Sequence, residues 1–348
     1  MNKKLKKFLH TFFKVMIIFL IATAVINVII FGAIYLNHTS KLKKESGYLV
    51  APGQMVEVNG HNMHVYVTGN LESDKVLVFL HNSKLVDDSV ALQPLFKELG
   101  DYKLVLVERS GVGYSENSGS PRDIDTILEE TRMALKGAGV EGPYTLVAMG
   151  TAGIEAIHWA NQYEEEVECI IGLNMYYPEQ FADITTEEYC GFFDYMMVPF
   201  YAIGGQRLVQ DLYPDNPYGL YSEAQMNVRK ALVSKGGYTK DMYEEDLATV
   251  NNAAMVAKEG IPENVDIKLI YGNPLMEPYV NVDKEVNKTY MEQSAANPDV
   301  DFVAEYNKEA KEYFKEYKNV SVEEISGPGR IYVYAPVELG EMIVEYLD

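Results

Sequence analysis

The feature that most constrains this chain is a 22-residue apolar run near its N-terminus, residues 15–36, in which only Thr23 and Asn27 are polar. As a helix this run would be about 33 Å long at 1.5 Å per residue, which matches the hydrocarbon core of a bilayer. A cleaved signal peptide has a shorter apolar region followed by a small-residue cleavage motif, and neither is evident here. A core helix is seldom apolar on every face over this length. Residues 15–36 therefore predict a transmembrane helix.

Lysines flank this run unequally. Five lysines lie in the basic segment 1–14, and three lie in residues 37–53, which we expect to form a linker. Positive charge favours the cytoplasmic side of a membrane. The excess on the N-terminal side predicts a single-pass membrane protein with its N-terminus inside and its large domain extracytoplasmic.

The rest of the chain is acidic. Residues 1–44 contain eight lysines and no acidic residue, so the total charge of −21 leaves −29 for residues 45–348. A domain with this charge repels nucleic acid and anionic lipid, which excludes nucleic acid as a partner. With 47% hydrophobic and 23% charged residues, the chain has the composition of a globular protein.

Strand-like and helix-like patterns alternate from residue 54 onward. Residues 55–69 alternate in polarity around Asn59–Gly60, a hairpin turn signal. Residues 75–81 and 103–108 are continuous apolar runs, typical of strands buried on both faces of a parallel sheet. Further elements are expected as helices at 87–100, 123–139, 153–163 and 336–347, and as strands at 143–149, 167–174, 266–273 and 319–325. The pattern predicts an α/β fold with a mostly parallel sheet flanked by helices.

Three segments, in this order, resemble motifs of the α/β-hydrolase superfamily. FLHNS (79–83) is similar to its oxyanion loop, with Asn82 where glycine is usual, and ERSGVGYSE (108–116) to its R-x-G-x-G-x-S turn. GPYTLVAMGTAGIEAIHWANQY (142–163) resembles its nucleophile elbow. The resemblance covers residues 54–348 and implies an α/β-hydrolase fold. Residues 175–260, rich in aromatic side chains, would then be a helical cap. We expect these aromatic residues to serve mainly in packing, and the alternative is that they line a substrate pocket.

The resemblance implies a serine nucleophile at the elbow, a histidine after the last strand and a carboxylate that orients it. Aligning YTLVAMGTAG on the elbow pattern puts Gly150 at the nucleophile, with Ala148 and Ala152 at the small flanking positions. A shift by one residue would make Thr151 the nucleophile. That register places Met149 where the turn needs a small residue.

The other two triad positions also lack their usual residues. No histidine follows position 158, and Gly329 or Arg330 stands where the resemblance places the catalytic histidine. The position of the acid falls on Asn273 or on Asn174, and an amide cannot stabilise an imidazolium as a carboxylate does. Three losses together predict a degenerate triad.

A ligand cleft is expected beside the elbow, lined by His81, Asn82, Met149, Gly150 and Thr151. Neither a Walker lysine nor a metal-ligand spacing such as H-E-x-x-H is present, so no cofactor and no metal are expected. Two cysteines are too few for a multi-cysteine zinc site, and we expect Cys169 and Cys190 to be buried free thiols.

The sequence thus favours a membrane-anchored, catalytically inactive α/β-hydrolase-fold protein that binds a small-molecule or protein ligand in a capped cleft. An alternative is an active esterase-, lipase- or peptidase-like hydrolase with a displaced nucleophile, Thr151 or Ser110, and His81 as its base. A third possibility is a purely structural domain displayed by its anchor.

Overall fold

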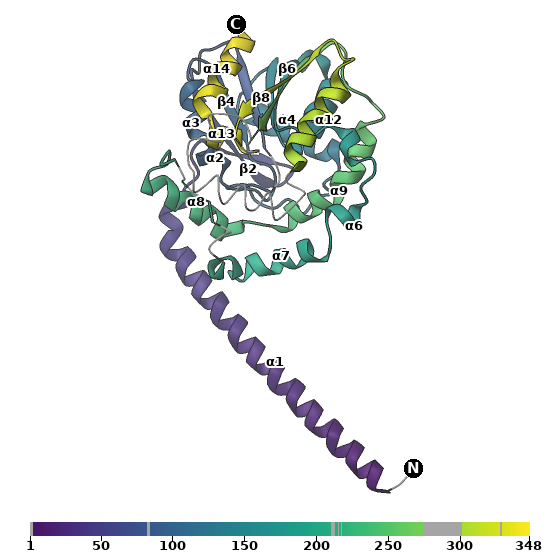
Figure 1. Ribbon diagram of the computed structural model, residues 1–348. Coiled ribbons are helices and arrows are strands. Elements are labelled where there is room, and N and C mark those ends of the chain that lie inside the picture. The colour runs from purple at the N-terminus through teal and green to yellow at the C-terminus, as the bar shows by residue number, and fades with distance from the viewer. Residues whose placement is uncertain are drawn as a thin grey trace.

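The computed structural model of the chain describes residues 3–81, 84–209, 213–214, 216, 218–273, 301–327 and 329–348 (Figure 1). A long N-terminal helix, α1 (Lys3–Glu45), leads away from a layered α/β domain, and the C-terminus lies on the far side of that domain (Figure 1).

The described strands form an eight-stranded sheet in the order β1-β2-β4-β3-β5-β6-β7-β8. The β2 strand runs antiparallel to both of its neighbours, and all other pairs are parallel. The strands are β1 (Gln54–Val58), β2 (His61–Gly69), β3 (Val76–Leu80), β4 (Lys103–Val107), β5 (Tyr144–Met149), β6 (Val167–Leu173), β7 (Asp266–Asn273) and β8 (Val320–Ser326). The predicted mostly parallel sheet is confirmed.

The opening hairpin turns where the sequence predicts. Asn59 and Gly60 both have positive φ, 49° and 87°, and Val58 pairs with His61 across the turn. Two successive left-handed residues give the turn the twist that antiparallel strands require. The central strands β3 and β5 consist almost entirely of apolar residues because helices cover both faces of the sheet; every residue of these two strands is buried.

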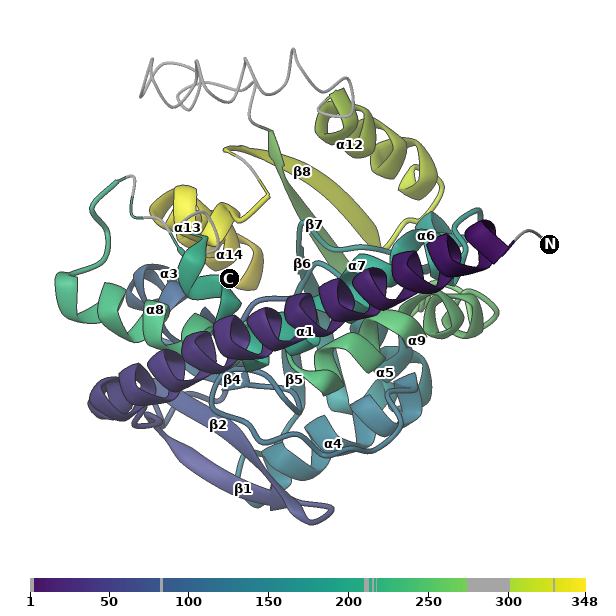
Figure 2. The same ribbon diagram turned by 90° about the horizontal axis from the view of Figure 1, so that it is seen from below.

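Two layers of helices enclose the sheet (Figure 2). On one face, α4 (Ile124–Gly137), α5 (Ala152–Gln162) and α12 (Asp301–Phe314) pack against it. On the other face lie α3 (Gln93–Glu98), α13 (Ile331–Tyr334) and α14 (Pro336–Leu347). The side chain of Asp123 caps α4 by accepting a hydrogen bond from Thr126 N at 3.0 Å.

One expected helix is wrong in detail. Residues 87–100 form two short helices, α2 (Asp88–Ala91) and α3, which meet at Leu92. Pro94 lies in the first turn of α3, where its missing N–H costs nothing, whereas inside a single longer helix it would remove a hydrogen bond.

The segment between β6 and β7 is helical. Its elements are η3 (Pro178–Phe181), α6 (Thr186–Tyr189), α7 (Phe192–Ala202), η4 (Gly205–Leu208), α8 (Glu223–Gly236) and α9 (Lys240–Val256). We refer to residues 175–260 as the insertion. It contacts the loops that follow β3 and β4, at the carboxyl-terminal edge of the sheet: Arg229 donates to Asp87, and Glu245 accepts from Arg109.

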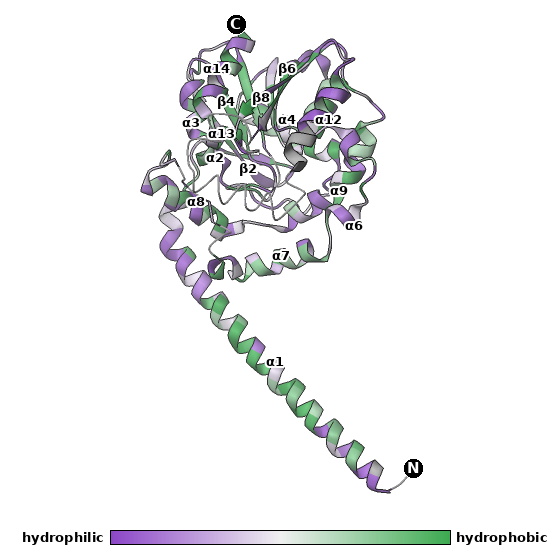
Figure 3. Ribbon diagram, viewed as in Figure 1, coloured by the Kyte–Doolittle hydropathy of each residue, from purple (hydrophilic) through white to green (hydrophobic). Residues whose placement is uncertain are grey.

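The α1 helix is 43 residues long and extends beyond the apolar run on both sides. It continues through residues 37–45, most of the expected linker, before the 3-10 turn η1 (Ser46–Tyr48). Its most apolar stretch has a mean hydropathy of 2.8 and no buried residue (Figure 3). Within the described part of the chain it is the one helix long and apolar enough to cross a membrane.

Candidate functional site

The turn between β5 and α5 centres on Gly150. This residue has a φ of +56°, and its N–H points to Leu173 O of the neighbouring β6 at 3.4 Å. Ala148 and Ala152, two positions to either side, are fully buried. A left-handed φ is strained for any residue with a Cβ, so glycine is the residue that backbone energetics favour here. The sharp strand-to-helix turn therefore lies where the elbow motif predicts, and its central residue has no side chain.

Thr151 is the next residue along, with ordinary helical backbone angles of −64° and −16°. Its side chain is buried and Oγ1 has no hydrogen-bond partner in the described structure. A hydroxyl nucleophile needs a base within hydrogen-bonding distance. The described residues supply none to Thr151, and its neighbour Met149 is buried within the sheet.

The two candidate acid positions have different surroundings. Asn174 directly follows β6 with a φ of +47°, and its Oδ1 accepts from Gly272 N at 2.9 Å. A Cβ added at Gly329 would lie 3.8 Å from Asn174 Nδ2. Asn273 is directed to β8 instead, where Nδ2 donates to Glu324 at 3.3 Å. Of the two amides, Asn174 is thus the one next to the expected histidine position.

His81 lies at the end of β3 and is fully buried. Its Nε2 accepts a hydrogen bond from the backbone N–H of Arg109 at 3.1 Å, which places the ring proton of the neutral form on Nδ1. That nitrogen is 4.0 Å from Asp88 Oδ2. The ring nitrogen that could act as a base is therefore already bonded to the main chain. Asn82 lies outside the described residues.

Ser110 belongs to a different network. Its Oγ donates to Asp241 Oδ2 at 2.5 Å and accepts from Ser118 N at 2.7 Å. The R-x-G-x-G-x-S turn is thereby bonded to α9 of the insertion. These bonds join Ser110 to a carboxylate and the main chain, and none of those described joins it to His81.

The structure brings together charged residues that sequence reasoning did not combine. Arg330 Nη2 lies 3.4 Å from Asp87 Oδ1 and 3.4 Å from Asp88 Oδ1. Tyr332 OH donates to the same Asp88 oxygen at 3.1 Å, and Arg229 Nε donates to Asp87 Oδ2 at 2.7 Å. The loop at the histidine position and the loop at the oxyanion position are therefore joined by an ion pair. We call these five residues the charged cluster.

The pKa values of Asp87 and Asp88 are shifted in opposite directions. Burial disfavours ionisation of Asp87, but Arg330 and Arg229 outweigh it and hold the pKa below its usual range. Burial raises the pKa of Asp88 despite Arg330 and His81, and Asp87 adds to that effect. Asp87 is thus the fixed anion of the cluster. In addition, Oδ2 of Asp88 and the hydroxyl of Ser89 are buried without a described hydrogen-bond partner.

A cavity of about 230 Å³ opens beside this cluster. Its walls come from the loop after β3, from the insertion and from the loop after β8; they include Lys84, Asp87, Tyr201, Tyr213, Val233 and Arg330. Lys84 Nζ lies 3.4 Å from Asp246 of α9, on the insertion side. Polar and aromatic groups from three separate segments thus converge on one small cavity at the sheet edge where α/β proteins bind ligands.

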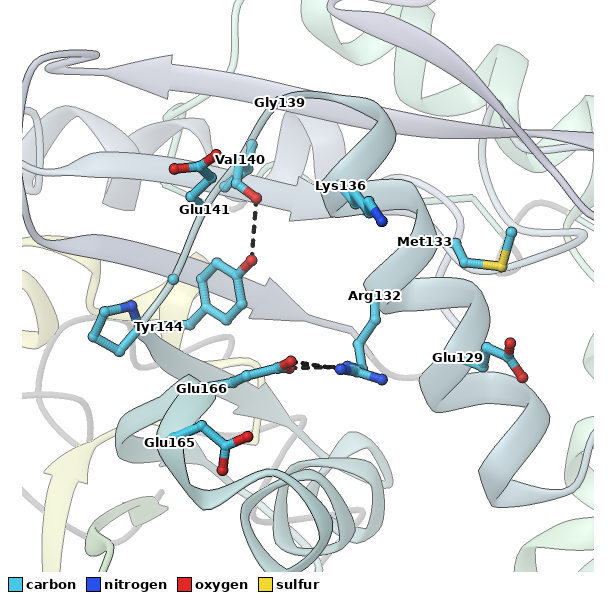
Figure 4. A pocket seen from close by; sticks show the side chains of 12 residues that line it. Glu129, Arg132, Met133, Lys136, Gly139, Val140, Glu141, Tyr144, Glu165 and Glu166 are labelled. Atoms are coloured by element: carbon cyan, nitrogen blue, oxygen red, sulfur yellow. Dashed lines mark hydrogen bonds and ion pairs between the residues drawn. The ribbon is translucent and has the colours of Figure 1, made fainter.

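A larger cavity, about 560 Å³, lies elsewhere (Figure 4). It is formed by α4, the loop before β5 and η2 (Glu164–Glu166), at the amino-terminal end of β5. Arg132 crosses it to an ion pair with Glu166, and Tyr144 OH donates to Val140 O at 3.1 Å (Figure 4). Arg132 is thus already paired, and Gly150 is at the other end of β5, so we assign no ligand to this cavity.

A second network of buried ion pairs connects α5, the helix that follows the elbow, to two other segments. Arg109, the arginine of the R-x-G-x-G-x-S turn, donates to Glu155 of α5 and to Glu245 of α9. Burial disfavours its charge, but the two carboxylates outweigh this and raise its pKa. Thr131 donates to the other oxygen of Glu155 at 2.7 Å. The turn, the elbow helix and the insertion are held together through one guanidinium.

No family model matches the chain. It is 24% identical to the uncharacterized protein YbdG of Bacillus subtilis over 347 residues, which cover 97% of this chain and 99% of that one. Among solved structures it is similar to a laboratory-evolved variant of potato epoxide hydrolase, with 16% identity, a TM-score of 0.59, and coverage of 84% of this chain and 98% of that one. The enol-lactonase of Burkholderia xenovorans gives 13% identity, a TM-score of 0.55, and coverage of 84% and 99%.

The two solved structures each match 84% of this chain. At such low identity they establish the fold and leave the chemistry to the residues of this chain. The chain has the α/β-hydrolase fold.

Proposed function

We propose that this protein is a membrane-anchored α/β-hydrolase-fold protein that binds a small ligand in its capped cleft without hydrolysing it. The observation that carries the proposal is the ion pair of Arg330 with Asp87 and Asp88. It occupies the space between the loops that, in a working hydrolase, would supply the histidine and the oxyanion donors. A guanidinium remains protonated at any accessible pH and cannot accept the proton of a nucleophile.

Geometry also argues against a displaced nucleophile. Gly150 has no functional group, and no base contacts Thr151 among the described residues. Ser110 Oγ is bonded to Asp241 and to the main chain. His81 Nε2 accepts from a backbone amide, so a change of local structure would be needed before it could take a proton.

The cavity beside the charged cluster supports ligand binding independently of any catalytic activity. The 230 Å³ cavity offers a lysine, an ion-paired arginine and two tyrosines on its walls. Directly after Asp87, which lines the cavity, Asp88 Oδ2 and Ser89 Oγ are buried polar atoms without a described hydrogen-bond partner, and such atoms are costly unless something satisfies them. We infer a small polar ligand rather than a lipid chain, because charged and hydrogen-bonding groups dominate these walls.

Membrane attachment by α1 is part of the proposal. It rests on the length and hydropathy of the apolar run and on the absence of buried residues in its most apolar stretch. The lysine asymmetry favours an orientation with the N-terminus inside and the domain outside. The anchored cleft would then meet extracytoplasmic molecules.

The test is ligand-induced thermal stabilisation of the full chain in detergent, screened with short carboxylic acids, hydroxy acids, lactones and esters. A ligand of the native state raises the melting temperature by mass action. We expect at least one class to stabilise the wild type and to stabilise Lys84→Met less, because Lys84 lines the cavity. Lys97→Met on α3, which is exposed, is the matched control. The absence of any shift, or equal shifts in Lys84→Met, would contradict the proposed site.

A further inference from the structure

The first turn of α7 presents large apolar side chains to solvent. The exposed fractions are 71% for Phe192, 84% for Phe193, 55% for Tyr195 and 44% for Met196. We call these four residues the α7 patch. The sequence leads us to expect packing roles for the aromatic residues of the insertion, and at these positions that expectation is wrong. A group of exposed aromatic residues on one helical turn marks a surface that contacts something apolar.

The α7 patch has little charge. Its neighbour Asp194 accepts a hydrogen bond from the backbone N–H of Gly191 at 2.9 Å, so this carboxylate caps the helix. Two further apolar side chains are exposed at the end of η4, the next element along the chain: Leu208, its last residue, is 68% exposed, and Val209, which follows it, is 40% exposed.

The α7 helix lies on the side of the domain from which α1 departs (Figures 1 and 2). In the hydropathy view, the hydrophobic part of α1 begins on this same side (Figure 3). A bilayer that surrounds the apolar run would therefore face α7, whereas the C-terminus and the loops before β3 and β5 point away from it.

Three side-chain hydrogen bonds join the end of α1 to the insertion. Arg207 of η4 donates to both carboxylate oxygens of Glu45, at 2.8 and 2.5 Å, and to His38 Nδ1 at 3.0 Å. His38 is only 3% exposed. A Cβ at Gly204 would approach the side chain of His38 to 2.4 Å, so the backbone of Gly204 packs directly against that imidazole. The end of α1 is thus held against the residues that follow α7, and this fixes α7 near the membrane end of the domain.

We propose that the α7 patch lies in the interfacial layer of the bilayer, as a second membrane contact beside α1. This inference rests on the proposed membrane attachment of α1. Aromatic side chains are favoured at the interface between headgroups and acyl chains, where Tyr195 can also keep its hydroxyl hydrated. The continuity of the α7 patch with the end of the anchor favours the bilayer over a protein partner or a second copy of the chain.

The charge of the domain determines which lipid suits this contact. Residues 45–348 carry −29, so anionic headgroups are repelled, and the apolar side chains must supply the attraction. The contact therefore forms on neutral phosphatidylcholine and does not depend on salt.

Quenching by brominated phosphatidylcholine tests this contact on the full chain in vesicles. Three single variants carry a tryptophan reporter: Phe193→Trp in the α7 patch, Phe19→Trp in the apolar run of α1, and Leu71→Trp in the loop before β3. All three positions are exposed, at 84%, 68% and 56%. The wild type supplies the background from its one tryptophan, the fully buried Trp159.

We expect the added emission of Phe193→Trp and Phe19→Trp to be largely lost in brominated vesicles, and that of Leu71→Trp to be unchanged. Quenching of Phe19→Trp without quenching of Phe193→Trp would overturn the α7 contact and leave the anchor standing. If the emission of Phe19→Trp is not quenched, the proposed membrane anchor is wrong, and so is the α7 contact that rests on it. Equal quenching of Leu71→Trp would mean nonspecific adsorption, which also overturns the proposal.

Discussion

Arg330, on the loop after β8, places Nη2 3.4 Å from Oδ1 of Asp87, on the loop after β3. In a hydrolase of this fold, these two loops lie on either side of the reacting bond. Here they are bonded to each other, and Arg229 of α8 adds a second cation to the same carboxylate. The ion pair therefore joins the loop after β8 directly to the loop after β3.

Removing that cation weakens the fold. Arg330→Gln leaves Asp87 and Asp88 buried with less compensation, and we expect the free energy of unfolding to fall by about 2 kcal/mol. Loss of one partner of a fully buried pair costs about 3–5 kcal/mol, but Arg330 is 30% exposed and Arg229 remains. Urea unfolding of the full chain in detergent measures the change.

The matched control is Arg132→Gln. Arg132 pairs with Glu166 at 2.5 Å on the opposite side of the molecule, with both side chains nearly 30% exposed. Its carboxylate partner can be solvated, so we expect a loss of less than about 1 kcal/mol. Equal effects of the two substitutions would mean that the charged cluster is no more than a surface ion pair.

Asp246 on α9 makes stability depend on pH. Burial raises its pKa to about 6, with Lys84 and the hydroxyl of Tyr238 opposing that rise. A carboxyl whose pKa is raised on folding destabilises the native state when ionised, so stability falls as the pH rises from about 4 through 6. Asp246→Asn should therefore stabilise the protein at about pH 7.5, by up to about 3 kcal/mol, and flatten this part of the pH profile. A variant less stable than the wild type at that pH would show that the contact with Lys84 dominates.

His64 on β2 has an acceptor at each ring nitrogen. Nδ1 lies 3.0 Å from Glu108 Oε2, and Nε2 contacts Pro52 O. Burial opposes the charge, but Glu108 outweighs it and raises the pKa of His64. For a raised histidine pKa, the stabilisation is complete below about pH 6.5 and is lost as the pH rises through the native value.

We therefore expect His64→Gln to lower the free energy of unfolding by about 1–3 kcal/mol near pH 6, and by less at pH 9. Urea titrations at the two pH values measure the difference. His10→Gln, at an exposed position on α1, is the control and should change neither value. A loss that is the same at both pH values would mean that the charged form of His64 contributes nothing.

Any side chain introduced at position 150 should destabilise the fold. At a φ of +56°, Gly150→Ala introduces a strained left-handed residue, and we expect a loss of about 1–2 kcal/mol. Gly47→Ala is the control, because nothing lies within 4 Å of the added Cβ and its φ is not left-handed. Thermal unfolding compares the pair, and equal melting temperatures would contradict a strained elbow at Gly150.

Local sequence signals predicted much of the fold. Continuous apolar runs identified the buried strands, and Asn59–Gly60 identified the hairpin turn, because each depends on neighbouring residues alone. The broken helix at Leu92 was missed, although Pro94 could have indicated it. No local pattern predicts the order of the strands, because neighbours in the sheet such as β2 and β4 are not consecutive in the chain.

The site depended on contacts that no local pattern contains. Arg330 and Asp87 are 243 positions apart, and the run Asp87–Asp88 reads as an ordinary helix start. The exposure of Phe193 was also missed, since apolar residues at helical spacing usually pack inward. Only the folded chain shows which face of α7 remains uncovered.

The most direct test of the central claim is labelling by a fluorophosphonate probe, with an ester-hydrolysis assay run in parallel on the full chain in detergent. The described residues around Gly150 contain no nucleophile–base pair, which predicts no labelling of the wild type and no hydrolysis above that of buffer. Covalent labelling of the wild type that is abolished by Thr151→Ala or by Ser110→Ala would contradict this and identify an active hydrolase with a displaced nucleophile.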